Sequence, residues 1–172
     1  MTPLNVKLTQ KEMLECKQAA TLRWQLARAS NVVNQKKDGN RNDNDIDLLG
    51  IKAELAVSKV LCCDHNIFQL GVDDGADMFL GEISIDVKST FYETGKLLFK
   101  SHNAFKASCS VLVTASENED VMVIAGWIPR QNFIKDAIEE NLGHGICYTM
   151  EQVYLRPIEA LWKTYQVTKY NN

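Results

Sequence analysis

The stretch DMFLGEISIDVK, from Asp77 to Lys88, decides the fold of this chain. Side chains on a strand point alternately to its two faces, so Asp86 and Lys88 share one face. The other face carries an apolar row suited to packing against a helix: Ile83, Ile85 and Val87. The pair Gly81-Glu82 supplies a turn, so the stretch predicts a hairpin whose first strand starts at Asp77. This hairpin would bring Asp77 close to Asp86.

Two carboxylates that meet beside a lysine indicate a possible metal site. Like charges at a few ångströms repel, and each carboxylate raises the pKa of the other. Mg²⁺ would relieve this repulsion, because it prefers oxygen ligands and keeps several positions for water or a phosphate. If the bound phosphate belongs to a nucleic acid, Lys88 would face the scissile phosphate, and the hairpin would suit metal-dependent cleavage of nucleic acid. The alternative is a surface hairpin on which Asp86 and Lys88 form a solvated charge pair.

A further acid lies on the helix predicted from Ile46 to Leu61, whose candidate N-caps are Asp45 and Asp47. On a helical wheel, Lys52 and Lys59 share one stripe, and Glu54 points about 160–200° away, into the apolar arc. A buried acid must be paired, protonated or bound to metal, because burying an unpaired charge is costly. Two readings of Glu54 stay open: an ion pair with an arginine of the first helix, or a third metal ligand.

These features in this order resemble the PD-(D/E)XK nuclease superfamily, in particular its small phage-encoded members. Residues 50–56, GIKAELA, resemble the family's helix with a glutamate after a glycine, and residues 85–90, IDVKST, resemble its core strand. Asp77 stands where the family has its first aspartate, although Ala76 replaces the proline of the name-giving motif. Asp73 and Asp74 are rival candidates. With the later strands included, the resemblance spans residues 50–163.

The resemblance implies an α/β fold, with a mixed central sheet flanked by helices in a restriction-endonuclease-like arrangement and an extra N-terminal helix. It implies a metal site for one or two Mg²⁺ ions, which Mn²⁺ could replace, with these ligands: Glu54, Asp77, Asp86 and the carbonyl of Val87. Lys88 would orient the attacking water or help to deprotonate it. The implied activity is metal-dependent hydrolysis of phosphodiester bonds in DNA, with endonuclease and exonuclease action both open.

Length and composition predict one domain over residues 1–172, since 45% hydrophobic content supports a proper core. Thr9 and Glu12 have capping-box spacing, which predicts an N-terminal helix within residues 1–33. A polar, mobile loop is expected over 34–45 and the catalytic core over 46–165. Within the core we expect strands over 109–115 and 121–128, a short helix over 131–140 and a closing segment over 154–165.

The chain shows no signal peptide, and no apolar run approaches the ~20 residues that cross a bilayer. We therefore expect a cytoplasmic protein without a membrane partner, in the host cytoplasm if a phage encodes it. The five cysteines lack a Cys-x-x-Cys pattern, and we interpret them as reduced packing residues.

The net charge of -3 is not typical of a nucleic-acid-binding protein, but local basic patches matter more than the sum. The candidates for contacts with DNA phosphates follow the Asp-x-Lys strand: Lys96, Lys100 and Lys106. A second basic group lies on or after the first helix: Arg23, Arg28, Lys36, Lys37 and Arg41. His102 is an alternative proton carrier. Ordinary solvated lysines are the competing interpretation.

Three functions remain open from the sequence. The first is the Mg²⁺-dependent deoxyribonuclease, for which a homodimer would suit paired cuts across a duplex. The second is a nucleic-acid-binding or inhibitory protein on the same fold, with little or no cleavage. The third is a structural subunit whose acidic cluster ties a helix to a hairpin.

Overall fold

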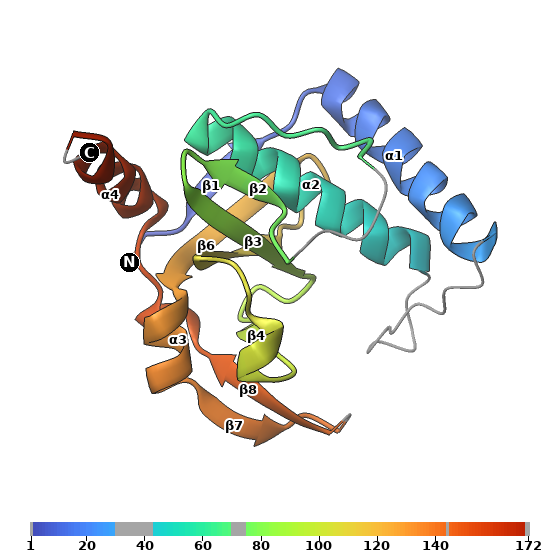
Figure 1. Ribbon diagram of the computed structural model, residues 1–172. Helices are drawn as coiled ribbons and strands as arrows, with labels where there is room; N and C mark the ends of the chain where they lie inside the picture. Colours follow the sequence, from blue (N-terminus) through green and yellow to red (C-terminus); the bar gives the residue numbers. More distant parts are fainter. Residues whose placement is uncertain (1, 30–42, 70–74, 144, 171–172) are drawn as a thin grey trace.

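The computed structural model of the chain describes residues 2–29, 43–69, 75–143 and 145–170 (Figure 1). Within these ranges the helices are α1 Gln10–Ala29, α2 Asp43–Leu61, α3 Arg130–Asp136 and α4 Ile158–Tyr170, with 3-10 turns η1 His102–Ala104 and η2 Gln152–Tyr154. The strands are β1 Leu4–Lys7, β2 Met78–Leu80, β3 Ile83–Thr90, β4 Leu97–Phe99, β5 Cys109–Ala115, β6 Val121–Pro129, β7 Ile138–Asn141 and β8 Ile146–Met150. The predicted α/β class is confirmed.

The larger sheet is mixed, and its strand order is β1-β6-β5-β3-β2. Only the β3–β5 pair is parallel among its described pairs. A parallel pair cannot be joined by a tight turn, so the chain crosses over between Thr90 and Cys109. This crossover carries β4, which joins β8 and β7 in a second, three-stranded sheet.

The hairpin predicted from the sequence is present at the β2 edge of the larger sheet. Met78 pairs with Ile85 and Leu80 with Ile83, which leaves Gly81-Glu82 as the turn. Gly81 has a φ of +60°, and a Cβ at this position would lie 2.5 Å from Cε2 of Tyr165. Glycine therefore satisfies both the left-handed backbone and the close approach of α4. The first strand starts at Met78, one residue later than predicted.

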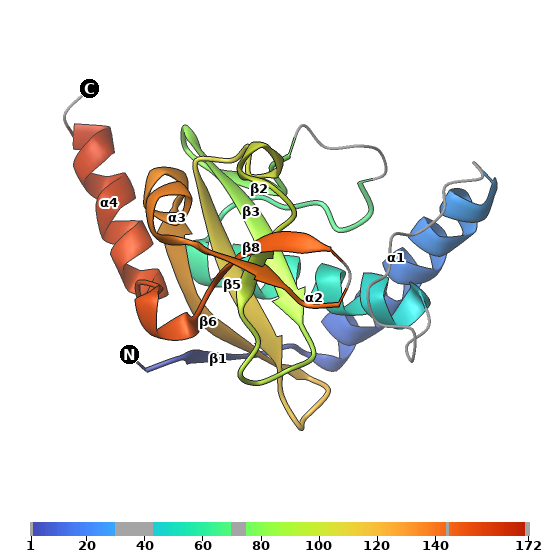
Figure 2. The same ribbon diagram turned by 90° about the horizontal axis from the view of Figure 1, so that it is seen from below.

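Helices and the second sheet bury opposite faces of the larger sheet (Figures 1 and 2). On one face α2 packs onto the strands through a core that includes Ala53, Val57, Leu61, Ile85, Val111 and Ile124. On the other face the second sheet and α3 close a core that includes Leu97, Phe99, Leu112, Phe133 and Met150. The outer side of α2 is covered by α1 through Cys16, Ala19, Ala20 and Ile51.

The N-terminal segment differs from the expectation of a helix alone. Residues 4–7 form strand β1, which pairs with β6 in the register Leu4↔Ile124 to Lys7↔Val121. The predicted capping box is present: the Thr9 amide donates to Glu12 Oε2 at 2.6 Å, and the Glu12 amide donates to Thr9 Oγ1 at 3.2 Å. The helix α1 then runs to Ala29.

Helix α2 begins earlier than predicted. It starts at Asp43, so Asp45 and Asp47 lie within the helix and do not cap it. The expected loop over 34–45 is therefore shorter, and its part from 34 to 42 lies outside the described residues. The predicted short helix over 131–140 is also wrong at its end, because α3 stops at Asp136 and 138–141 form strand β7.

The two lysines that share a stripe on α2 both contact neighbouring elements. Lys52 is buried, and its Nζ donates to the carbonyl oxygen of Glu119 at 2.8 Å. Lys59 donates to the Lys7 carbonyl at 3.1 Å and to Glu12 Oε2 at 2.8 Å. Both lysines therefore tie α2 to neighbouring backbone and side chains.

Two further expectations are addressed by the structure. All five cysteines are free, and Cys16, Cys109 and Cys147 are buried, but Cys62 is exposed and is not a packing residue. Among the described residues, no helix is long and apolar enough to span a membrane.

Candidate functional site

Glu54 lies on α2, buried between α1 and the segment that follows α2. Its carboxylate accepts two hydrogen bonds from Arg23 of α1, Nη1 to Oε1 at 3.4 Å and Nη2 to Oε2 at 3.2 Å. It also contacts His65 Nε2, which lies 3.0 Å from Oε2. Burial raises the pKa of Glu54, but the His65 hydrogen bond and the Arg23 charge outweigh it and bring the pKa below the usual value. The expected burial of Glu54 is confirmed, and Arg23 is an arginine of the first helix.

His65 was not among the residues predicted for the site. It reaches Glu54 because the chain reverses at the end of α2, where Cys62 has a φ of +51°. The Cys63 amide donates to the Ser58 carbonyl at 3.2 Å and closes this turn. The sequence offers no clear signal for the reversal, since glycine and asparagine are the usual residues with positive φ.

Asp77 lies directly before β2, and both its side chain and its backbone are hydrogen-bonded to β3. Its Oδ2 accepts a hydrogen bond from the Val87 amide at 2.6 Å, and its own amide donates to the Ile85 carbonyl at 2.8 Å. Burial, followed by the charge of Glu54 and, more weakly, that of Asp86, raises the pKa of Asp77 to about 8. The hydrogen bond from Val87 and the charge of Lys88 oppose this shift without cancelling it.

Asp86 and Lys88 share a face of β3, as the alternation predicts. Asp86 is buried, and the Lys88 ammonium forms an ion pair with its Oδ1. The Lys88 side chain is 40% exposed, so its end can reach solvent or a ligand. Its Nζ also lies 5.1 Å from the centroid of the Phe99 ring, which belongs to β4 in the crossover. Lys88 is therefore held between a carboxylate and an aromatic face.

The structure thus brings the four predicted catalytic residues to one end of the β2–β3 hairpin: Glu54, Asp77, Asp86 and Lys88. The charges of the other three all act on the Asp77 carboxyl group. Each carboxylate has a different hydrogen-bond partner, and among the described residues no three His, Cys, Asp or Glu side chains converge as a cation site. A bound cation would require these side chains to turn from their present partners toward one point.

The chemistry of the donor set fits Mg²⁺. Three carboxylates offer hard oxygen ligands, and a negative charge on the buried Asp77 is unfavourable without a compensating cation. The backbone of Val87 lies beside the Asp77 carboxylate, which accepts its N–H. Glu54, Asp77 and Asp86 would hold the ion. The rival candidates Asp73 and Asp74 lie outside the described residues.

The basic residues predicted to contact DNA occupy different environments. Lys96 pairs with Glu140 at 2.8 Å and with Glu151 at 3.7 Å, so its charge is balanced by acids. Lys100 and Lys106 are exposed. A Cβ added at Gly75 would lie 2.9 Å from Cβ of Lys106. Lys106 therefore lies beside Gly75, the residue two positions before Asp77.

His102, the alternative proton carrier, belongs to the 3-10 turn η1 in the crossover between β3 and β5. Its ring packs on Tyr148 with the centroids 4.0 Å apart, and its Nε2 has no hydrogen-bond partner in the described structure. The remaining basic candidates Lys36, Lys37 and Arg41 lie outside the described residues, whereas Arg28 belongs to α1.

Comparisons with known proteins give no relative from which a function could be transferred. No family model, curated protein or solved structure matches the chain.

Proposed function

We propose that this protein is a Mg²⁺-dependent nuclease that hydrolyses phosphodiester bonds in DNA. The observation that carries the proposal is the placement of two buried carboxylates, Glu54 and Asp86, and the partly exposed Lys88 around Asp77, whose pKa burial and these carboxylates raise. Buried acids with such shifts beside a lysine are typical of functional sites. The resemblance of the Glu54 to Lys88 segment to PD-(D/E)XK nucleases supports the same conclusion.

The protein's own residues have separate roles in this proposal. Glu54, Asp77 and Asp86 hold the cation, which when bound lowers the pKa of water and neutralises charge on the phosphate. Lys88 is partly exposed beside Asp86, so its ammonium can orient a water or contact a phosphate oxygen. Arg23 and His65 hold the Glu54 carboxylate in a fixed orientation until the cation competes for it.

A DNA cleavage assay with matched variants tests this proposal. Labelled linear, circular and single-stranded DNA is incubated with Mg²⁺, Mn²⁺ or EDTA. We expect cleavage with either metal and none with EDTA. Asp86→Asn removes a ligand and should abolish cleavage, and Lys88→Met should lower turnover by about 10²–10⁴ while metal binding persists.

The control is Glu82→Gln, which removes an exposed acid in the turn of the same hairpin. It should cleave like the wild type. Equal activity of the wild type and Asp86→Asn, or cleavage in EDTA, would contradict the proposal. Cutting of circular DNA would identify an endonuclease.

One observation favours the second candidate, a DNA-binding or inhibitory protein with little cleavage. Glu54 already has two partners, Arg23 and His65, which compete with a metal for its carboxylate. This candidate predicts binding of DNA in the assay above without metal-dependent products.

A further inference from the structure

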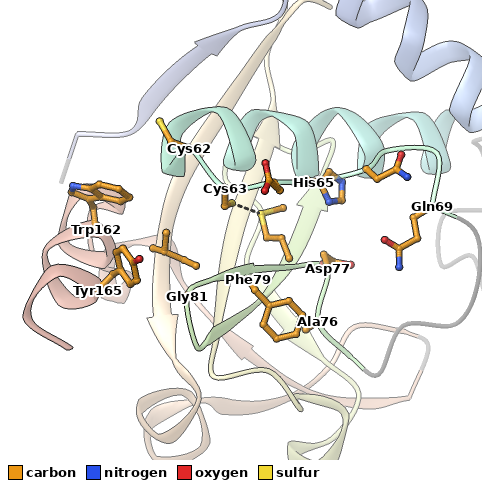
Figure 3. Close-up of a pocket in the computed structure, with 14 residues that line it drawn as sticks. Cys62, Cys63, His65, Gln69, Ala76, Asp77, Phe79, Gly81, Trp162 and Tyr165 are labelled. Atoms are coloured by element: carbon orange, nitrogen blue, oxygen red, sulfur yellow. Dashed lines mark hydrogen bonds between the residues drawn. The ribbon is translucent and has the colours of Figure 1, made fainter. Parts of the chain in front are cut away.

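A groove leads away from the acid cluster along the β2 edge of the larger sheet (Figure 3). Its volume is about 510 Å³. Asp77 and His65 line one end, and Trp162 and Tyr165 of α4 line the other. Asp77 lines the groove and is also one of the four candidate catalytic residues, so the groove is continuous with the candidate catalytic site.

The far end of the groove presents aromatic rings. Trp162 is 39% exposed, and its ring centroid lies 5.6 Å from that of Tyr165. Tyr165 is fixed in place because it packs against the turn at Gly81. Partly exposed aromatic rings in a groove bind nucleobases by stacking, without selecting a sequence.

The dimensions of the groove suit one strand of nucleic acid. From Asp77 to Gly81 the extended chain covers about 13 Å at roughly 3.3 Å per residue. Stacked bases are about 3.4 Å apart along a strand, so this length holds a few nucleotides. A base inside a duplex is already stacked on its neighbours, so stacking on Trp162 favours unpaired bases.

The charges along the groove determine how such a strand would lie. Among the described residues that line it there is no lysine or arginine, and Asp64 and Asp77 are acidic. Phosphates are therefore disfavoured inside, and bases are favoured. Outside the groove the exposed Lys106 lies beside Gly75, where it can contact the backbone of the strand near Asp77.

We propose that this groove binds a short single-stranded stretch of DNA, with a base stacked on Trp162 and the phosphates turned outward. The bound strand runs toward Asp77, so the groove delivers a single strand or a frayed end to the acidic residues. This inference rests on the nuclease function proposed above and names its substrate class.

Tryptophan fluorescence tests the groove separately from cleavage. An oligothymidylate and a hairpin duplex of equal mass are titrated in EDTA into the wild type and the variants Trp162→Ala and Trp162→Phe. The control is Tyr154→Ala, which removes an exposed ring that does not line the groove. Trp127 is buried, and Trp24 of α1, which is half-buried and does not line the groove, is replaced by Phe in every protein titrated, so quenching by a stacked base reports on Trp162.

We expect the oligothymidylate to quench the wild-type emission and to bind Trp162→Ala about tenfold more weakly. Trp162→Phe should retain the affinity without the quenching, since phenylalanine also stacks, and Tyr154→Ala should match the wild type. Equal affinity of Trp162→Ala and the wild type for the single strand would overturn the inference, as would unchanged emission at saturation.

The two proposals fail in distinguishable ways. If the wild type cleaves DNA with Mg²⁺ but Trp162→Ala binds the single strand normally, the groove proposal alone is wrong. If Trp162→Ala loses single-strand binding but the wild type cleaves nothing, the nuclease proposal is wrong and the groove remains a binding site.

Discussion

Arg23 of α1 forms a two-point ion pair with Glu54 of α2, with N–O distances of 3.2 and 3.4 Å. The pair links the helix that covers α2 to the acid that the sequence predicts as a metal ligand. The Arg23 side chain is 29% exposed and that of Glu54 11%, so the pair is shielded from most solvent. The contact links α1 to α2, and it would compete with the metal that the proposed function requires.

Arg23→Gln should therefore have two opposite effects. Of its partners in the described part of the chain, Glu54 then keeps His65 alone, so we expect the free energy of unfolding to fall by about 1–3 kcal/mol. Metal affinity should rise several-fold, because the cation no longer displaces the guanidinium. Urea unfolding and Mn²⁺ titration calorimetry measure the two effects. Unchanged Mn²⁺ affinity would show that Glu54 is not a ligand.

Asp77→Asn should stabilise the metal-free protein at neutral and alkaline pH. The pKa of Asp77 is raised from 3.8 to about 8 in the folded state, so its ionisation opposes folding. The wild type therefore loses stability as pH rises between about pH 4 and pH 8, and the variant does not. The Asn side-chain oxygen can still accept the Val87 hydrogen bond.

The expected advantage of Asp77→Asn is on the order of 5 kcal/mol near pH 8 and close to zero below pH 4. Thermal unfolding in EDTA across this pH range measures it. An advantage that stays constant with pH would mean that the Asp77 carboxyl does not titrate as proposed.

Gly81→Ala should lower the free energy of unfolding by about 1–3 kcal/mol, because the new Cβ meets Tyr165 and the backbone has positive φ. Adding Tyr165→Ala should relieve only the contact, and a double-mutant cycle separates the two terms. Gly50→Ala is the matched control, since a Cβ there meets nothing within 4 Å. It should stabilise α2 slightly.

Lys106→Gln should weaken binding to DNA and reduce the slope of log affinity against log salt by about one. Lys96→Gln should change the slope less, because Glu140 and Glu151 already balance the Lys96 charge. Binding is measured in EDTA at several salt concentrations. Equal effects of both variants would contradict a specific role for Lys106.

The sequence predicts the parts of the fold that depend on local patterns. Alternation along residues 83–88 predicts the hairpin, and the helical wheel predicts the burial of Glu54; both are confirmed. The capping box at Thr9 is confirmed for the same reason. Each of these signals is contained within a few residues, so no knowledge of distant contacts is needed.

Features set by distant partners could not be predicted. The four residues of β1 become a strand only because β6, more than a hundred residues later, offers a free edge. Lys52 is buried because it reaches the Glu119 carbonyl in the turn before β6. His65 joins the site through the reversal at Cys62. The positive φ of Cys62 could not be predicted, because cysteine has no preference for this conformation. The restriction-endonuclease-like arrangement and the metal site stay predictions.

The crossover from Thr90 to Cys109 exists because β3 and β5 are parallel, and it supplies Phe99, the ring beneath the Lys88 ammonium. Phe99 in turn packs against Phe105 and Phe133 in the core under the second sheet. The electrostatic environment of Lys88 thus depends on the hydrophobic core under the second sheet, which lies on the same face of β3 as the lysine. Substitutions in that core would tune the reactivity of Lys88 without touching any acid of the site.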